Sequence, residues 1–255
     1  FLMQDAEEFE LLLAKMAASK QENVSRIARG FSQKEPKERS AVISTAQGAT
    51  ELFESPELRS ATEISSFSFE SLKDEVASVF IIVPPEYLEA YRPFLRMMTG
   101  LATVAMTRNA TKPKHPVLFL LDEMPALGHL KMVEQAYGLM AGFGMQLWGI
   151  TQDLSQLKRI YGDGWETFVS NSGVLQYFGS RDQMTAEYFS KLCGVTTVWN
   201  VSTAISTVFG GNNSNSETKA QGQRSLAFAD ELMTLRSDQQ ILLFENAYPI
   251  KGIKT

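Results

Sequence analysis

Two adjacent acids, Asp122 and Glu123, are the residues whose types and spacing most clearly suggest chemistry. They directly follow the apolar run 117–121. A short, wholly apolar run is typical of a strand buried on both faces of a parallel sheet, and the carboxyl edge of such a sheet is where ligands bind. In P-loop enzymes the first acid of such a pair helps to hold Mg²⁺, and a second can activate the attacking water. The alternative is a polar turn in which Asp122 caps a helix.

Two further polar residues follow strand-like segments. Gln152 follows the segment 146–150, and Arg181 follows the segment 174–178. We expect both at the same sheet edge as the acid pair, because the carboxyl ends of parallel strands lie together. Gln152 could hydrogen-bond the attacking water and the γ-phosphate, and Arg181 could stabilise the charge of the transition state. A turn or capping role for Gln152 and a surface position for Arg181 are the alternatives.

The motif that cradles phosphates is missing from the sequence. A P-loop requires Gly-x-x-x-x-Gly-Lys followed by Ser or Thr, so that backbone N–H groups and a Lys enclose the phosphates. Neither Gly-Lys-Ser nor Gly-Lys-Thr occurs in the 255 residues. We therefore expect these residues alone to be inactive, and ATP and Mg²⁺ to act only in a longer protein. The chain opens at Phe1 within a helical pattern, and we expect it to be a fragment.

Other kinds of site are less well supported. His115 and His129 flank the acids but lack the His-Glu-x-x-His spacing of a helical zinc site. The single Cys193 excludes an internal disulfide, suits a reducing compartment and is expected in the core. No Gly-x-Ser-x-Gly elbow is present. Five methionines are interpreted as core filling: Met97, Met98, Met124, Met140 and Met145.

Strand and helix patterns alternate along most of the chain, which predicts an α/β fold with a mostly parallel sheet. The expected strands are 79–83, 117–121, 146–150, 174–178 and 240–244. The expected helices are 93–108, 130–140, 154–161, 183–193 and 229–235. Residues 195–208 alternate like an exposed strand or hairpin, and the Gly- and Asn-rich segment 210–216 is expected to be mobile.

The N-terminal part has a different pattern. Residues 2–29 predict one or two amphipathic helices, and the polar segment 33–39 is a candidate domain boundary. The share of hydrophobic residues, 44%, is that of a globular protein, and a net charge of −5 gives no global argument for binding nucleic acid. No apolar run approaches the length of about 18 residues that spans a bilayer, and the first residues do not resemble a signal peptide.

Several motifs follow one another along the chain. They are Leu120-Leu-Asp-Glu-Met-Pro-Ala-Leu-Gly128, Trp148-Gly-Ile-Thr-Gln-Asp-Leu-Ser-Gln-Leu157, Tyr161-Gly162, Asn171-Ser172, Tyr177-Phe-Gly-Ser-Arg-Asp182, Arg224-Ser-Leu226 and Asp230-Glu-Leu232. Together these motifs resemble one known family, the TraG-like coupling proteins of type IV secretion and conjugation. The similarity extends from about residue 40 to the end, and the motifs keep the family's order.

The resemblance implies a RecA-like hexameric ATPase, anchored at the cytoplasmic face of the bacterial inner membrane. Such proteins link the relaxosome to the secretion channel and drive single- or double-stranded DNA, or protein, through it. Asp122 and Glu123 would form the Walker B pair, with Asp122 holding Mg²⁺ through water, and Gln152 would sense the nucleotide. Residues 1–36 would end an inserted all-helical domain, and 37–255 would belong to the motor domain. The P-loop and the membrane anchor would lie before Phe1.

One departure from the family concerns the segment 138–144, where several relatives carry basic residues and this sequence has none. Arg181 then becomes the nearer candidate for a phosphate-contacting arginine. Two other functions stay open at this point. One is a non-hydrolysing docking module for relaxosome or channel proteins, and the other is a different RecA-like DNA translocase.

Overall fold

The computed structural model describes residues 5–206 and 214–254, which divide into two compact units. Unit 1 lies within Phe1–Ser68 and Val83–Phe94, and unit 2 lies within Phe69–Ile82 and Leu95–Thr255. In the candidate boundary segment 33–39, Pro36 occupies the first turn of a helix, and the segment lies within unit 1. The assignment of 1–36 to an inserted domain and of 37–255 to a motor domain stays a prediction.

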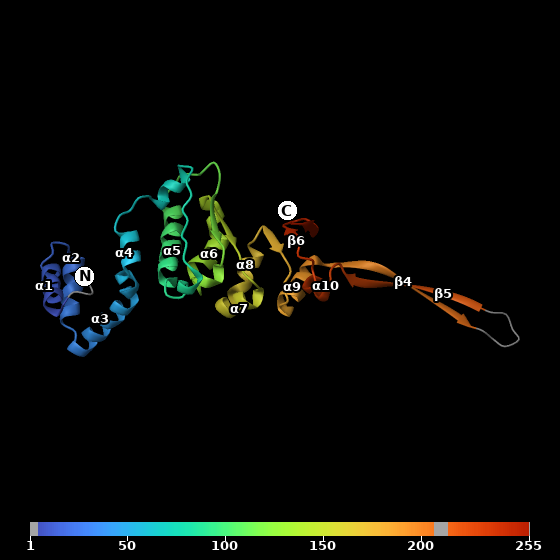
Figure 1. Cartoon of the computed structure of the whole chain (residues 1–255), viewed down its shortest axis with the longest axis horizontal. Coiled ribbons are helices and arrows are strands. Elements are labelled where there is room, and N and C mark those ends of the chain that lie inside the picture. Colours follow the sequence, from blue (N-terminus) through green and yellow to red (C-terminus); the bar gives the residue numbers. More distant parts are fainter. Residues whose placement is uncertain (1–4, 207–213, 255) are drawn as a thin grey trace. The chain divides into compact units, whose positions relative to one another are not determined.

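Unit 1 is helical (Figure 1). Phe9 and Phe31 meet edge to face at 6.3 Å, and the Ser25 hydroxyl donates to the Ala17 carbonyl at 2.6 Å. The amphipathic helices expected in residues 2–29 are therefore present as a packed pair. The helices are α1 (Ala6–Ala17), α2 (Glu22–Ser32), α3 (Pro36–Thr50) and α4 (Pro56–Thr62), with 3-10 turns η1 (Glu51–Glu54) and η3 (Pro85–Tyr87).

Unit 2 combines strands and helices. Its helices are α5 (Arg92–Arg108, from Leu95 onward), α6 (Lys131–Leu139), α7 (Leu154–Tyr161), α8 (Glu166–Ser170), α9 (Gln183–Cys193) and α10 (Ala229–Met233). Its strands are β1 (Val117–Leu121), β2 (Met145–Gly149), β3 (Val174–Tyr177), β4 (Val195–Ser206), β5 (Ser214–Ser225), β6 (Gln239–Phe244) and β7 (Ile250–Ile253). Short 3-10 turns are η2 (Phe69–Lys73), η4 (Met124–Leu127), η5 (Met140–Phe143) and η6 (Gly162–Trp165).

The strands form three small sheets in the part of the chain that the structure describes. β1 and β2 are parallel, β3, β6 and β7 are antiparallel in that order, and β4 pairs with β5. The mixed α/β fold with a parallel pair at the acid motif is confirmed. The sequence pattern missed β7 and the antiparallel direction of β6. Part of the segment 210–216, expected to be mobile, lies outside the described residues, and 214–216 belong to β5.

Two expectations about buried strands were wrong. The segment 79–83 forms no strand, and the side chains of Phe80 and Ile82 are 82% and 86% exposed. β1 is covered on one face only, where Phe119 packs against the cluster containing Met106 of α5. On its other face Leu118 and Leu120 are half exposed. An apolar run therefore predicts burial only if a second layer of structure is available to cover it.

The main core of unit 2 lies among α6 to α10 and the strand β3. Leu157 and Leu232 are almost completely buried there, and Cys193 is a buried free thiol as expected. Met124 and Met145 are 3% exposed, which confirms their packing role, whereas Met97 is exposed. Among the described residues, no helix combines the length and the apolar character needed to cross a membrane.

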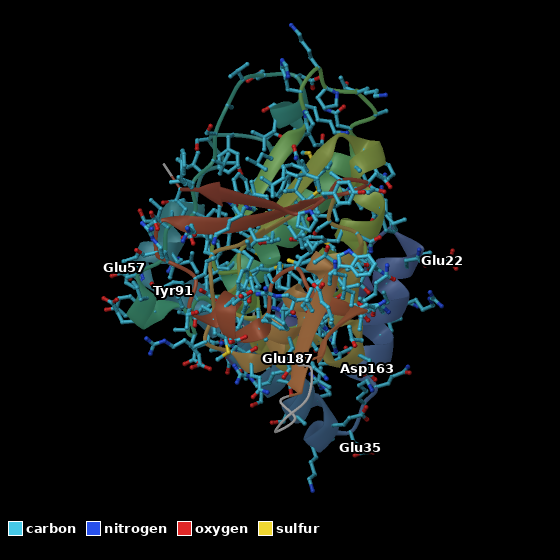
Figure 2. All side chains as sticks on the ribbon, turned by 90° about the vertical axis from the view of Figure 1, so that its right-hand side faces the viewer. Glu22, Glu35, Glu57, Tyr91, Asp163 and Glu187 are labelled. Atoms are coloured by element: carbon cyan, nitrogen blue, oxygen red, sulfur yellow. The ribbon has the colours of Figure 1, made fainter. Side chains whose placement is uncertain are left out.

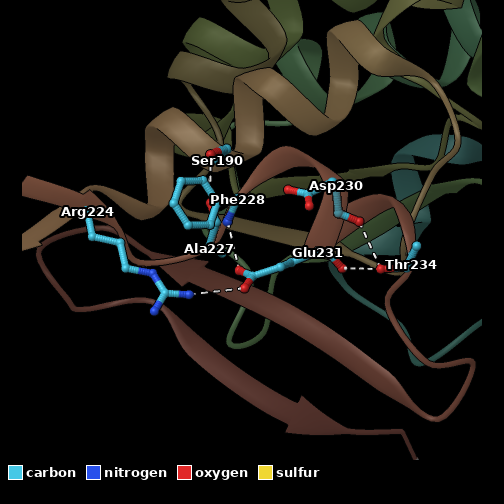
Figure 3. A network of polar contacts seen from close by, with 7 residues as sticks. All are labelled: Ser190, Arg224, Ala227, Phe228, Asp230, Glu231 and Thr234. Carbon is cyan, nitrogen blue, oxygen red and sulfur yellow. Dashed lines mark hydrogen bonds and ion pairs between the residues drawn. The ribbon is translucent and has the colours of Figure 1, made fainter.

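The strands β4 and β5 form a long two-stranded ribbon that projects away from α9 and α10 (Figure 1). The base of the ribbon is the end that contains Val195 and Ser225. An isolated two-stranded ribbon is marginally stable in water, so its attachment to the unit matters. The Arg224 guanidinium donates to the Glu231 carboxylate, which also accepts the Phe228 N–H (Figure 3). The Ser190 hydroxyl donates to the Ala227 carbonyl at 2.6 Å. These contacts join the base of the ribbon to α9 and α10.

Candidate functional site

The acid pair and Gln152 lie at the same edge of the parallel pair β1–β2. Leu121 is opposite Gly149 in the ladder, and the Ile150 N–H donates to the Leu121 carbonyl at 2.9 Å. The residues that follow both strands therefore emerge side by side. Asp122 and Gln152 are exposed, and Glu123 is half-buried.

The loop that carries Arg181 is joined to the start of α7 by side chains. The Ser155 hydroxyl donates to the Asp182 carboxylate at 2.8 Å, and the Leu154 N–H donates to the Thr185 hydroxyl at 2.9 Å. The carboxyl ends of β2 and β3 thus lie at the same end of unit 2. Arg181 itself is exposed. The structure therefore links the loops of all the predicted site residues, through the ladder between β1 and β2 and through side chains between β2 and β3.

Gln156 contacts the acid pair, and the sequence pattern did not indicate it as a candidate site residue. Its amide nitrogen donates to the Glu123 carboxylate at 3.5 Å, a long contact, and its amide oxygen accepts from the Thr151 hydroxyl at 3.2 Å. The available signal was Asp153, whose carboxylate caps α7 by accepting the Gln156 N–H at 2.6 Å. Because the cap fixes the first turn of α7, it also fixes where the Gln156 side chain meets the acid pair.

A cleft of about 830 Å³ lies between β2 and β3. Gln152 and Ser180 line it at the carboxyl ends of these strands, and Met145 and Gly173 line it at the other end. Its walls are mostly apolar, and the polar side chains in its lining include those of Gln152, Asn171 and Gln176. Of the predicted site residues, Gln152 is therefore the one that lines this cleft.

Asp182 holds the loop after β3 in place and has a perturbed pKa. Burial opposes its ionisation, but hydrogen bonds from Thr185 and Ser155 outweigh burial and hold the pKa of the carboxyl below its usual value. A carboxyl with a lowered pKa in the folded state stabilises the protein above its unfolded pKa of about 4, and this contribution is lost as the pH falls through the folded value.

Asp182→Ala should lower the free energy of unfolding by about 1 kcal/mol at neutral pH, the usual cost of losing a helix cap. The difference from the native chain should shrink below about pH 4, because the native carboxyl also becomes neutral there. Urea denaturation at the two pH values measures both effects. Asp182→Asn is the control, since Asn can still cap α9 without titrating. An equal difference at both pH values would contradict the role of the charge.

Arg96 of α5 positions the segment that follows the acid pair. One of its terminal nitrogens donates to the carbonyls of Leu127 and His129, each at 2.8 Å. The Tyr161 hydroxyl also donates to the neighbouring Gly128 carbonyl, at 3.4 Å. The Arg96 guanidinium therefore fixes the backbone of the segment 127–129.

Arg96→Gln should lower the free energy of unfolding by about 3 kcal/mol, because it removes two hydrogen bonds from a charged donor, and such bonds contribute roughly 1.5–3 kcal/mol each. Arg108→Gln, at the exposed end of the same helix, is the matched control and should change stability little. Urea denaturation of both variants provides the comparison. Equal losses would mean that Arg96 acts only as a surface charge.

Several of the motif residues have packing or capping roles. Leu127, Tyr161, Tyr177 and Leu232 are buried, and the Tyr177 hydroxyl donates to the Leu232 carbonyl at 3.3 Å. In contrast, Asp122, Gln152 and Arg181 present exposed polar groups at one end of the unit. Packing does not require polar side chains there, so these residues are the strongest candidates for ligand contact.

Comparison with known proteins adds independent evidence. A family model described as "Type IV secretory system Conjugative DNA transfer" matches residues 3–255. The Conjugal transfer protein TraG of Agrobacterium fabrum is 31% identical over 218 residues, which are 85% of this chain and 33% of the relative. Protein VirD4 of the same organism is 31% identical over 207 residues, which are 80% of this chain and 31% of the relative. The chain thus spans about a third of the curated relatives that it matches.

The fold is also found in solved structures. The unbound monoclinic form of the bacterial conjugative coupling protein TrwBdeltaN70 has a TM-score of 0.71 and 16% sequence identity. The alignment covers 96% of this chain and 57% of that chain. A structure of TrwB in complex with ADP and Mg²⁺ has a TM-score of 0.68 at 16% identity. At this level of identity, the likeness establishes the fold.

Proposed function

We propose, from the premise that this chain belongs to the conjugative DNA-transfer family of the type IV secretory system, that it forms part of the ATPase motor of a coupling protein. The motor would deliver DNA, or protein, to a secretion channel. The observation that carries the proposal is the shared edge of β1 and β2, where Asp122–Glu123 and Gln152 emerge together.

The chemistry of the side chains at this edge fits ATP and Mg²⁺. Carboxylate oxygens are the ligands that Mg²⁺ prefers in proteins, and two adjacent acids supply them at an exposed strand end. Asp122 would hold the ion through water, and the ion would neutralise phosphate charge. Glu123, half-buried and in contact with Gln156, is suited to accept a proton from the attacking water. Gln152 would contact the γ-phosphate, and Arg181 would stabilise charge from the neighbouring loop.

The family supports a proposal for the whole protein, of which this chain spans about a third in the curated relatives. The phosphate-binding loop and a membrane anchor would lie in the part of the family chain that this sequence does not span. Residues 1–36 would end an inserted helical domain. Partners would be single- or double-stranded DNA, relaxosome proteins, channel components and further copies in a hexamer. The whole protein would act at the cytoplasmic face of the bacterial inner membrane.

The decisive experiment joins this chain to the preceding segment of the Agrobacterium fabrum TraG relative and measures phosphate release from ATP. We expect hydrolysis that requires Mg²⁺, and none from the 255 residues alone. Asp122→Asn should raise the Mg²⁺ concentration needed by about 10–100-fold, as loss of a water-mediated contact does. Hydrolysis by the 255 residues alone, or an Asp122→Asn variant with unchanged Mg²⁺ dependence, would overturn the proposal.

A further inference from the structure

The strand β7 ends at the same edge of unit 2 as the strands that carry the predicted site. β6 is antiparallel to β3, and β7 is antiparallel to β6, so β7 runs in the same direction as β3. The start of α9, which follows β3, is hydrogen-bonded to the start of α7, which follows β2, through Thr185 and Leu154. Lys254, the residue after β7, therefore lies at this carboxyl edge together with the loop that contains Arg181.

Lys254 contacts Phe178, the residue that directly follows β3. The Lys254 ammonium lies 4.5 Å from the centre of the Phe178 ring and donates to the Phe178 carbonyl at 3.4 Å. The backbone N–H of Lys254 donates to the Asp238 carbonyl at 2.8 Å, which fixes the point from which the side chain extends. A cation over the face of an aromatic ring is attracted by the quadrupole of the ring. The two side chains therefore form one unit, here called the Phe178–Lys254 pair.

The ring of the pair is exposed on a loop that is held in place. Phe178 is 51% exposed, whereas the preceding Tyr177 is buried and stacks on Phe189 at 4.5 Å. The Ser180 N–H donates to the Tyr177 hydroxyl at 2.9 Å, and the Asp182 N–H donates to the Ser180 hydroxyl at 3.1 Å. The loop thus presents an aromatic surface that loses little conformational freedom when a ligand binds to it.

The ring and the predicted site residues follow one another along the edge. Asp122 and Glu123 follow β1, Gln152 follows β2, and Phe178 follows β3. Gln152 and Phe178 line the same cleft. From β1 to β3 the edge therefore carries carboxylates suited to Mg²⁺, an amide, and an aromatic ring beside a cation. A nucleoside diphosphate carries matching groups in this order, with phosphates that bind Mg²⁺ at one end and a flat base at the other.

We infer that the Phe178–Lys254 pair holds the base of the bound nucleotide, which stacks on the exposed part of the Phe178 ring. Lys254 is a positioning residue that fixes the ring. The inference rests on the proposed function, because its ligand is the nucleotide whose phosphates would meet the acid pair, and it adds the residues that contact the base. Stacking does not read the hydrogen-bonding edge of a base, so the pair should accept adenine and guanine alike.

Binding of ADP and of pyrophosphate separates the base from the phosphates. The protein is this chain joined to the preceding segment of the TraG relative, and binding is measured by isothermal titration calorimetry with Mg²⁺. Phe178→Ala should weaken ADP and GDP binding by about 5- to 100-fold, the usual effect of removing one stacking ring. Pyrophosphate binding should not change. Phe178→Tyr keeps the ring and should bind ADP like the native chain. Unchanged ADP binding in the Phe178→Ala variant would overturn the inference.

Phe244→Ala is the matched control for Phe178→Ala. Phe244 is 41% exposed and pairs with Val174 at the start of β3, so it lies at the opposite edge of the same sheet. The same truncation at this position should change the binding of neither ADP nor pyrophosphate. An equal loss of ADP binding in the two variants would reject a specific contact between Phe178 and the base.

Lys254→Gln tests whether the cation acts through the ring. It should weaken ADP binding less than Phe178→Ala does, and it should add nothing in the Phe178→Ala background, because the ring through which it acts is gone. Lys254→Arg keeps a cation and should restore ADP binding. A full effect of Lys254→Gln in the Phe178→Ala background would contradict the positioning role.

A DNA base could stack on the same ring, so an oligothymidylate of about ten nucleotides is a third probe. If Phe178→Ala weakens its binding and leaves ADP binding unchanged, the ring belongs to DNA and the inference fails. ADP binding that depends on Phe178, without ATP hydrolysis, would reject only the proposed function. Hydrolysis together with ADP binding that is independent of Phe178 would reject only the inference. A joined protein that binds neither ADP nor pyrophosphate would reject both.

Discussion

Glu123→Gln should leave nucleotide binding intact and lower ATP hydrolysis by about 100- to 10,000-fold, the usual contribution of a general base. The variant is tested in this chain joined to the preceding segment of the TraG relative. The amide has the same shape as the carboxylate but does not take a proton from water. The half-buried position and the contact with Gln156 hold the side chain at the strand end in either form. Single-turnover phosphate release, measured beside nucleotide binding, separates the two effects.

Glu187→Gln is the matched control for Glu123→Gln. Glu187 lies on the exposed surface of α9 (Figure 2). Asp163 of η6 is likewise an exposed acid (Figure 2). The same chemical change at Glu187 should leave hydrolysis unchanged. A near-normal rate in the Glu123→Gln variant would remove Glu123 from the catalytic role, and the strand-end geometry would then need another explanation.

Gly149→Ala should lower the free energy of unfolding by about 3 kcal/mol, the upper part of the range for overpacked cores. A methyl group at this position would lie 2.3 Å from the Tyr137 hydroxyl oxygen and 2.8 Å from the Met124 sulfur. Tyr137 has little room to move, because its ring packs against Phe168 at 5.0 Å. Burial raises the pKa of Tyr137 to about 12, opposed by the Gly149 N–H, so the hydroxyl stays neutral at ordinary pH. Urea denaturation of the 255-residue chain measures the loss.

A double variant identifies the cause of that loss. Tyr137→Phe removes the oxygen that the new methyl group would meet, so Gly149→Ala should cost clearly less in this background. Gly173→Ala, where a methyl group would meet nothing within 4 Å, is the control and should be close to neutral. If Gly149→Ala costs the same with and without the Tyr137 hydroxyl, the clash is not the reason.

The sequence by itself determined the elements whose hydrogen bonds are local. Helices α7 and α9 begin directly after their capping residues Asp153 and Asp182, which agrees with the expected helices 154–161 and 183–193. The acid pair and Gln152 were placed correctly after their strands, because an apolar run that ends in polar residues marks the end of a strand. The motif resemblance to conjugative coupling proteins was confirmed by the family match. The roles of Asp122, Glu123, Gln152 and Arg181 remain proposals.

Only the tertiary structure decided the features that depend on a distant partner. The segment 79–83 has the composition of a strand but is exposed, because a strand also needs a neighbouring edge, which its own residues do not supply. Gln156 and Arg96 were missed because their contacts, to Glu123 and to the Leu127 carbonyl, join positions more than 30 residues apart. The open cleft between β2 and β3 follows from the same physics, since strand pairing and the covering of a sheet belong to two segments together and are not contained in either one alone.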